Sequence, residues 1–253
     1  MRIVFDIGGT KMRIAKSVSG NSLTESVVLP TPPAYSKGLE QLVREIKALA
    51  GSDAIQSIAG GVPAVLNEDK TVIVNAANLS DWSGKTFAAD LVSEFKCPVK
   101  LENDAALGAL GEASAGAGKD FKTVTYIAIG TGIGGAWVID KKLSNSEHSF
   151  EPGHHIIDPE GLVCPGDGKK GHWEAYINEP DFLTYLVTGL HNTLLYWPAD
   201  VVVLGGGVTL HSNWNIKEIQ SKLEELLSGS DTNPEIKIAE LGDDAGLYGS
   251  LLL

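Results

Sequence analysis

Apolar and polar residues alternate along the chain in two kinds of pattern, which indicate two kinds of element. In several stretches the apolar residues recur every three or four positions, as on the buried face of a helix. These stretches are residues 39–49, 87–95, 182–195 and 216–227. Short, mainly apolar runs at residues 97–101, 200–204 and 235–241 are typical of buried strands. Strands that alternate with helices predict an α/β protein whose sheets are largely parallel and covered by helices.

A second pattern is an internal repeat. Residues 2–15 reappear in outline as residues 125–139, and each copy reads as a strand, a glycine turn and a strand. The repeat predicts two related halves. Because no low-complexity segment separates them, we expect the halves to meet across a cleft.

Composition narrows the classes of function. The 253 residues are 43% apolar and 21% charged, as in an ordinary globular protein. A formal charge of −12, without a cluster of lysine and arginine, argues against nucleic acid as a partner. The apolar runs are too short for a membrane helix and the first residues lack a secretory signal, so we expect no membrane partner and a cytoplasmic location. Cys97 and Cys164 are expected to be reduced thiols.

Three glycine turns follow apolar runs, at residues 6–11, 130–135 and 205–207. Glycines leave backbone N–H groups accessible, which suits a bound phosphate. Taken singly, each turn is more typical of a simple hairpin; three in one chain favour a phosphate site. None fits a Walker A loop, because the chain has no G-x-x-x-x-G-K-S/T. A Rossmann fingerprint does not fit either, because residues 130–135 run into the strand-like residues 136–139.

A series of short motifs in one order carries a resemblance to a known family. The motifs are residues 6–11, Gly-Val-Pro at 61–63, Asn-Leu at 78–79 with Trp82, Glu-Asn-Asp-Ala at 102–105, residues 130–135, Glu-Pro-Gly-His at 151–154, Glu-Ala-Tyr at 174–176, residues 205–207, and residues 245–249. On these motifs the chain resembles the ROK sugar kinases of the actin-like ATPase superfamily. The resemblance implies two ribonuclease-H-like domains around a central cleft. Residues 1–104 and a C-terminal helix at 243–253 would form the small domain, and residues 105–242 the large one.

The resemblance also implies roles for individual residues. Asp104 would be the catalytic base, because a carboxylate can orient a sugar hydroxyl and accept its proton. Without the family, Asp104 reads as the N-cap of a helix over residues 105–113, and Asp6 as a cap at a strand end. The sugar would be bound by Asn78, Asn103, Asp104, Glu151, His154 and Glu174. ATP and Mg²⁺ would be bound by Asp6, Gly8, Gly9, Thr10, Lys11, Gly130, Thr131, Gly132, Gly205, Gly206 and Gly207.

One loop departs from the family pattern. The family shows C-x-C-G-x-x-G-C-x-E, whose three cysteines bind a structural zinc ion together with the histidine of E-x-G-H. Here only Cys164 remains, His172 replaces the last cysteine, and Asp167 or Gly166 stands at the middle one. The candidate ligands are His154, Cys164, His172 and Asp167. Their donor atoms still suit Zn²⁺, but their spacing along the sequence differs from the family pattern. A structural zinc site and a metal-free loop held by packing both stay open.

The function expected from the resemblance is an ATP-dependent hexose kinase that phosphorylates glucose at O6. The alternatives are a kinase of N-acetylhexosamines or fructose, a glucokinase that uses polyphosphate, and a sugar-binding sensor without catalysis. The stretch between Glu174 and Asp200 is shorter than the family usually has. The usual dimer surface of the family is therefore in doubt, and a homodimer stays open.

Overall fold

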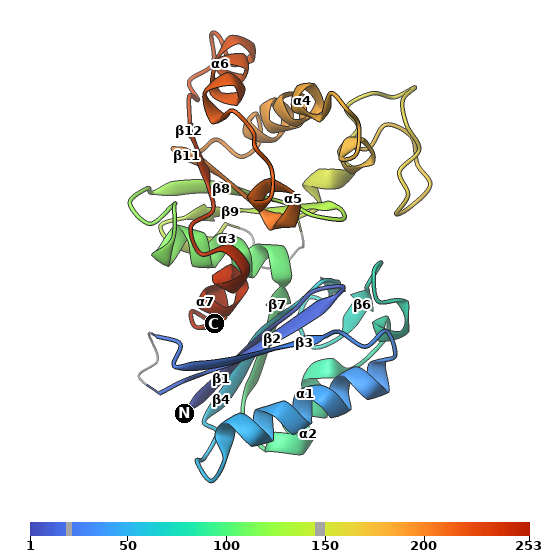
Figure 1. Ribbon diagram of the computed structural model, residues 1–253, viewed down its shortest axis with the longest axis vertical. Helices are drawn as coiled ribbons and strands as arrows, with labels where there is room; N and C mark the ends of the chain where they lie inside the picture. Colours follow the sequence, from blue (N-terminus) through green and yellow to red (C-terminus); the bar gives the residue numbers. More distant parts are fainter. Residues whose placement is uncertain (19–21, 145–149) are drawn as a thin grey trace. The chain divides into compact units, whose positions relative to one another are not determined.

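The chain forms two compact units, which share one helix. The computed structural model describes residues 1–18, 22–144 and 150–253. Unit 1 contains Met1–Gly111 and Asp244–Leu253, and unit 2 contains residues 112–144 and Phe150–Asp243. The chain passes from unit 1 to unit 2 within helix α3 (Asp104–Ala115) and returns just before helix α7 (Ala245–Ser250) (Figure 1).

Unit 1 is built on a five-stranded mixed sheet. Its strands are β1 (Arg2–Ile7), β2 (Lys11–Ser17), β3 (Glu25–Pro30), β4 (Ser57–Val62) and β7 (Val99–Asn103). The order is β3-β2-β1-β4-β7. The first three strands form an antiparallel meander, and β4 and β7 run parallel to β1. The carboxyl ends of β1, β4 and β7 therefore lie at one edge of the sheet.

Successive side chains of β1 point to opposite faces of this sheet, and helices cover both faces. Ile3, Phe5 and Ile7 pack into a core with residues of α1 (Tyr35–Ala50) and α2 (Phe87–Phe95). Val4 points to the other face, where it packs with Leu247 of α7. Figure 1 shows α1 and α2 together on one face. A short hairpin, β5 (Val65–Leu66) with β6 (Ile73–Asn75), and the 3₁₀ helix η1 (Ser80–Trp82) complete the unit.

Unit 2 contains a second five-stranded sheet. Its strands are β8 (Thr123–Ile129), β9 (Ile133–Ile139), β10 (Lys142–Leu143), β11 (Val201–Gly205) and β12 (Glu235–Ile238), in the order β10-β9-β8-β11-β12. Helices α4 (Phe182–Leu194) and α6 (Ile216–Leu226) pack on it around Ile127 and Ile129. The remaining elements are the short helix α5 (Gly206–Leu210) and the 3₁₀ helices η2 (Pro152–His154), η3 (Trp173–Tyr176) and η4 (Gly242–Asp244).

The two sheets share one topology, which confirms the internal repeat. In each, the repeated segment forms an antiparallel hairpin, β1 with β2 and β8 with β9. One later strand pairs in parallel with the first strand, and a second pairs in parallel with that one. The predicted helices are also confirmed, α2 at Phe87–Phe95 among them. The prediction of largely parallel sheets is wrong. Half of the strand pairings in each five-stranded sheet are antiparallel, because strands that follow one another through a short connection pair antiparallel, as in β1–β2–β3 and β8–β9–β10.

Two smaller observations bear on the predictions from composition. Cys97 and Cys164 are both free and buried, as expected for thiols outside a disulfide. Among the described residues, no helix combines the length and the apolar character that crossing a membrane requires.

Candidate functional site

The carboxyl edge of the unit 1 sheet gathers the residues expected at the acceptor end of the site. The register pairs Asp6 with Gly61 and Val62 with Asn103, so the ends of the three parallel strands are level. A Cβ atom on Gly61 would lie 3.0 Å from Oδ1 of Asp6 and 3.2 Å from the Cα of Asp104. A glycine is needed here because any larger residue would fill the space between the two aspartates.

Helix α3 begins directly after this edge, and Asn103 provides its cap. Oδ1 of Asn103 accepts a hydrogen bond from the backbone N–H of Ala106 at 3.1 Å, the bond that defines an N-cap. Oδ1 of Asp104 accepts one from the next residue, Ala105, at 2.9 Å. The sequence left open that Asp104 is the cap. In the structure this role falls to Asn103, and Asp104 lies half-buried in the first turn of the helix.

The first glycine turn lies beside the same edge. It is closed by a hydrogen bond from Gly8 N to Lys11 O at 2.8 Å, and the hydroxyl of Thr31 donates to Gly8 O at 2.8 Å. Gly9, Thr10 and Lys11 are exposed. A Cβ on Gly9 would lie 3.3 Å from the Cβ of Asn78, so the turn adjoins the loop expected to bind sugar. Exposed N–H groups beside polar side chains suit a phosphate next to a polyol.

In unit 2, the second and third glycine turns are neighbours because they follow adjacent parallel strands. Gly205 at the end of β11 pairs with Ala128 in β8, and the second turn begins at Gly130. Gly206 has φ +84°, and a Cβ on it would overlap the carbonyl oxygen of Ile129. The predicted nucleotide-side residues of unit 2 are thus brought together: Gly130, Thr131, Gly132, Gly205, Gly206 and Gly207.

Glu174, expected to bind sugar, lies against the second glycine turn. Its Oε2 accepts a hydrogen bond from Ile133 N at 3.3 Å, and a Cβ on Gly132 would lie 2.7 Å from the same oxygen. Its Oε1 accepts a hydrogen bond from the thiol of Cys164 at 3.0 Å. The carboxylate therefore connects the glycine turn to the loop of candidate metal ligands.

Glu151 stands on the other side of that loop. Its Oε2 is 4.0 Å from Nε2 of His154. Burial raises the pKa of Glu151, His154 opposes this change, and Glu174 adds to it. A cavity of about 420 Å³ within unit 2 adjoins Glu151, and it is lined also by Pro152, His155, Asn192, Tyr196 and Trp197.

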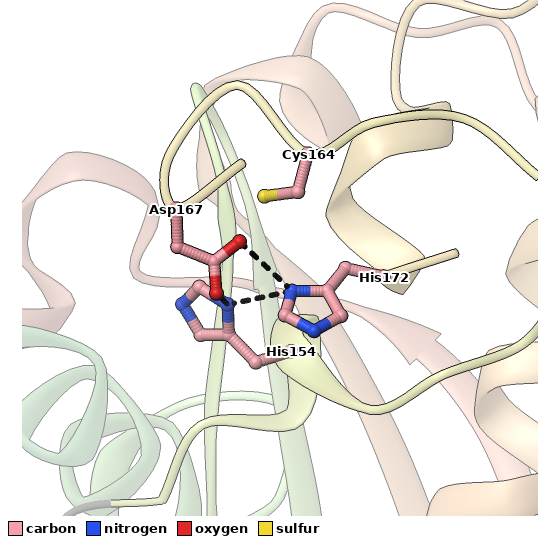
Figure 2. A group of neighbouring side chains, drawn as sticks. All are labelled: His154, Cys164, Asp167 and His172. Atoms are coloured by element: carbon pink, nitrogen blue, oxygen red, sulfur yellow. Dashed lines mark hydrogen bonds and ion pairs between the residues drawn. The ribbon is translucent and has the colours of Figure 1, made fainter. Parts of the chain in front are cut away.

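Figure 2 shows four potential metal ligands turned toward a common point. One donor atom from each lies within 4.8 Å of all the others, in the cluster His154, Cys164, Asp167 and His172. The Nδ1 atoms of the two histidines are 3.1 Å apart, and Oδ1 of Asp167 is 3.4 Å from Nδ1 of His172. Zinc–nitrogen bonds at tetrahedral angles place neighbouring donors about 3.3 Å apart. The donor types suit Zn²⁺, and the distances from Nδ1 of His172 to His154 and to Asp167 are close to this value.

The fold of the loop explains how changed spacing still converges. Residues 164–169 form a tight turn. The backbone N–H of Cys164 donates a hydrogen bond to Lys169 O at 2.7 Å, and that of Gly168 donates one to Cys164 O at 2.9 Å. The turn brings Cys164 and Asp167 to one side. Burial raises the pKa of the Cys164 thiol, and its hydrogen bond to Glu174 adds to the rise. The backbone N–H of Lys169 lowers the pKa of Asp167.

Two residues near the acceptor edge carry contacts that sequence reasoning missed. Thr31 holds the first glycine turn from 23 positions away, and Lys70 pairs with Glu102, beside Asn103, from 32 positions away. Neither contact leaves a local pattern in the sequence, so only the fold reveals them.

These features define a class of protein, and comparison with known proteins names the family. Two sheets of one topology, each with a glycine turn after its first strand, are the plan of the actin-like ATPase fold. The model of the ROK family matches residues 2–193, and the chain belongs to that family.

The similar proteins bear kinase names. A glucokinase of Streptomyces coelicolor is 28% identical over 73% of this chain, which spans only 58% of that relative. An N-acetyl-D-glucosamine kinase of Escherichia fergusonii is 27% identical over 98% of this chain and 97% of its own. The crystal structure of the ROK hexokinase from Thermus thermophilus superposes with a TM-score of 0.81 at 28% identity, over 99% of this chain and 96% of that one.

Proposed function

We propose that this chain is an ATP-dependent sugar kinase that transfers the γ-phosphoryl group of ATP to a hexose hydroxyl, O6 of glucose. The observation that carries the proposal is the carboxyl edge of the unit 1 sheet, where Asp104, Asn103 and Asp6 meet the first glycine turn. Membership of the ROK family and the kinase names of similar proteins support it.

The chemistry assigned to Asp104 is proton transfer. Its carboxylate accepts the hydrogen of the sugar hydroxyl, and the proton passes to Asp104 as the oxygen bonds to the γ-phosphorus. The bond from that phosphorus to the bridging oxygen breaks, and ADP leaves. Among the described residues, Nδ2 of Asn103 makes one long contact of 3.4 Å, with Ala64 O, so it could donate to a neighbouring sugar hydroxyl. Asp6 would hold Mg²⁺, whose charge would offset the charge that develops on the phosphoryl oxygens.

The donor is assigned to the glycine turns. Backbone N–H groups of turns from both units would bind the phosphates, and Gly205, Gly206 and Gly207 the adenosine side. The two units would act as the ribonuclease-H-like domains expected from the sequence, one carrying the acceptor groups around Asp104 and the other carrying Glu151, His154 and Glu174. Hydrolysis of ATP by water would be suppressed when both units hold their substrates.

The test is a panel of sugars with ATP and with polyphosphate, in which consumption of the donor and formation of the sugar phosphate are both measured. We expect glucose with ATP to give the highest kcat/KM. Phosphorylation with polyphosphate and not with ATP would show that polyphosphate is the donor. If calorimetry detects sugar binding but no donor supports turnover, the sensor alternative would replace the kinase proposal.

A kinase of N-acetylhexosamines is the second candidate, and the cavity beside Glu151 favours it. The cavity has room for a substituent larger than a hydroxyl, and its lining offers Asn192 and aromatic rings. The N-acetyl-D-glucosamine kinase of E. fergusonii also matches over nearly the full length of both chains. Asn192→Ala should weaken binding of an N-acetylhexosamine and leave glucose unchanged if this candidate is right. Equal effects on both sugars would argue against it.

We also propose that the cluster of His154, Cys164, Asp167 and His172 holds one structural zinc ion. The support is the convergence of four donors within 4.8 Å of one another, with the two histidine nitrogens 3.1 Å apart. The ion would hold the loop between Glu151 and Glu174 in one shape. Metal analysis of protein purified without added zinc tests this, and we expect one zinc per chain.

A further inference from the structure

A buried ion pair ties the β5–β6 hairpin to the strand that carries the acceptor residues. Nζ of Lys70 lies 2.5 Å from Oε1 of Glu102. Only 18% of the Lys70 side chain and 7% of the Glu102 side chain are exposed, so water screens the pair poorly. Across residues 1–18, 22–144 and 150–253, Lys70 is the one cation within ion-pair distance of Glu102.

The hairpin presents Lys70 in an unusual backbone conformation. Lys70 has φ +56°, in the left-handed region that a lysine seldom adopts. The turn is fixed by Asn67, whose Oδ1 accepts hydrogen bonds from Thr71 N at 2.7 Å and Val72 N at 2.8 Å, while its carbonyl accepts one from Lys70 N at 2.9 Å. A strained residue held by its surroundings points to a role for its side chain.

Glu102 transmits this contact to the acceptor residues. The same Oε1 that binds Lys70 accepts a hydrogen bond from the backbone N–H of Asn103 at 2.9 Å. Asn103 in turn caps helix α3 at Ala106 and contacts Ala64 O. The peptide that leads into Asp104 is therefore held by a carboxylate whose own position depends on Lys70. The hairpin also leads directly to the loop with Asn78, since β6 ends at Asn75.

We propose that Lys70 is a positioning residue of the phosphoryl transfer: through Glu102 it fixes Asn103 and Asp104 relative to the sugar. This inference rests on the proposed function. Without the lysine charge, Glu102 is a buried carboxylate with no compensating cation, and it relaxes by moving toward water and shifting the Asn103 peptide. A shift of about 1 Å at a reacting group costs up to about 100-fold in rate. In this proposal Lys70 acts through Glu102 and not by direct contact with sugar or nucleotide.

The experiment compares Lys70→Met, Lys70→Arg, Glu102→Gln and the double variant Lys70→Met/Glu102→Gln. We expect Lys70→Met to lower kcat/KM for the sugar about 10–100-fold and to leave KM for ATP unchanged, because ATP is bound by the glycine turns. Lys70→Arg keeps the charge and should retain most activity. The double variant leaves no buried charge unpaired, so it should recover activity relative to Lys70→Met. The matched control is Lys47→Met, which breaks an exposed ion pair with Glu94 in the same unit.

Thermal unfolding of each variant separates positioning from loss of fold. If Lys70→Met does not fold, the double variant decides, and its failure to regain activity while folded would overturn the proposal. Activity of Lys70→Met within twofold of wild type would overturn it too. So would equal increases in KM for sugar and for ATP. Sugar affinity by calorimetry is measured in parallel. If the wild type binds sugar without turnover, the kinase proposal fails, and an unchanged sugar affinity in Lys70→Met then overturns the positioning proposal by itself.

Discussion

At the scale of the residue, the proposed reaction depends on one carboxylate. Asp104→Asn keeps the size of the side chain and its ability to bind a hydroxyl, and it removes the acceptor of the proton. We expect kcat to fall about 10²–10⁴-fold, with sugar affinity close to wild type. Steady-state kinetics and calorimetry on the same preparation measure the two effects. The control is Asp53→Asn at an exposed aspartate of the same unit; a kcat near wild type in Asp104→Asn would refute the assignment.

A second residue-scale prediction concerns the third glycine turn. Gly206→Ala places a side chain at φ +84° and against Ile129 O, so the free energy of unfolding should fall by about 1–3 kcal/mol. The adjacent Gly207 offers a matched control, because its added Cβ meets nothing within 4 Å. Gly207→Ala should change stability by less than about 0.5 kcal/mol. Urea unfolding measures both, and equal effects would show that the strained turn is not the cause.

What the sequence could predict about single residues depends on distance along the chain. Asn103 and Asp104 lie in a short motif, so both could be named in advance, although the cap fell to Asn103 because only its side chain reaches the N–H of Ala106. The pair of Lys70 with Glu102 could not be named. A buried lysine reads in the sequence like any lysine in a polar turn, and its partner is set by how the hairpin folds back.

At the scale of the element, the proposed zinc site predicts that the loop of residues 154–172 would link metal binding to sugar binding. A thiol at Cys164 donates its hydrogen to Glu174 Oε1, whereas a metal-bound thiolate has none to donate. With zinc bound, that oxygen would be left to accept a hydrogen bond from a sugar hydroxyl. Removing zinc with a chelator, or replacing a ligand in His172→Ala, should therefore weaken sugar binding about tenfold and slow the saturated enzyme much less.

The measurement is sugar affinity by calorimetry with metal content determined on the same samples. His211→Ala replaces an exposed histidine of the same unit and should change neither. If the protein carries no zinc and keeps full sugar affinity in strong chelator, Cys164 and His172 are remnants of a lost site. The loop would then be held by hydrogen bonds and by the packing of Trp173, which is fully buried.

Periodicity predicted the elements better than it predicted their pairing. The apolar stretch 39–49 lies within α1, which ends before Gly51 at φ +56°, and the stretch 87–95 matches the bounds of α2. The direction of the strands was less accessible, because a buried strand reads the same whether its neighbour is parallel or antiparallel. The weakly amphipathic β3 and the two-residue β5 left too little pattern to be predicted.

At the scale of the whole molecule, the two halves share a plan and differ in what they carry. The repeat was visible in the sequence because a strand, a glycine turn and a strand need similar residues in both copies. The acceptor residues around Asp104 belong to unit 1, whereas Glu151, His154 and Glu174 belong to unit 2. Under the proposed function, both sets of residues would be required for sugar binding and phosphoryl transfer.

This division predicts a change of shape on binding. In the proposed reaction, the hydroxyl that Asp104 would orient has to come in line with a phosphoryl group that glycine turns would hold, and water has to be kept away. We expect the radius of gyration from small-angle scattering to decrease when sugar and nucleotide are both saturating, and to decrease less with either alone. Asp104→Asn allows the measurement with ATP itself, because turnover is suppressed while both ligands bind. An unchanged scattering curve at saturation, with binding verified by calorimetry, would contradict closure of the two units on their substrates.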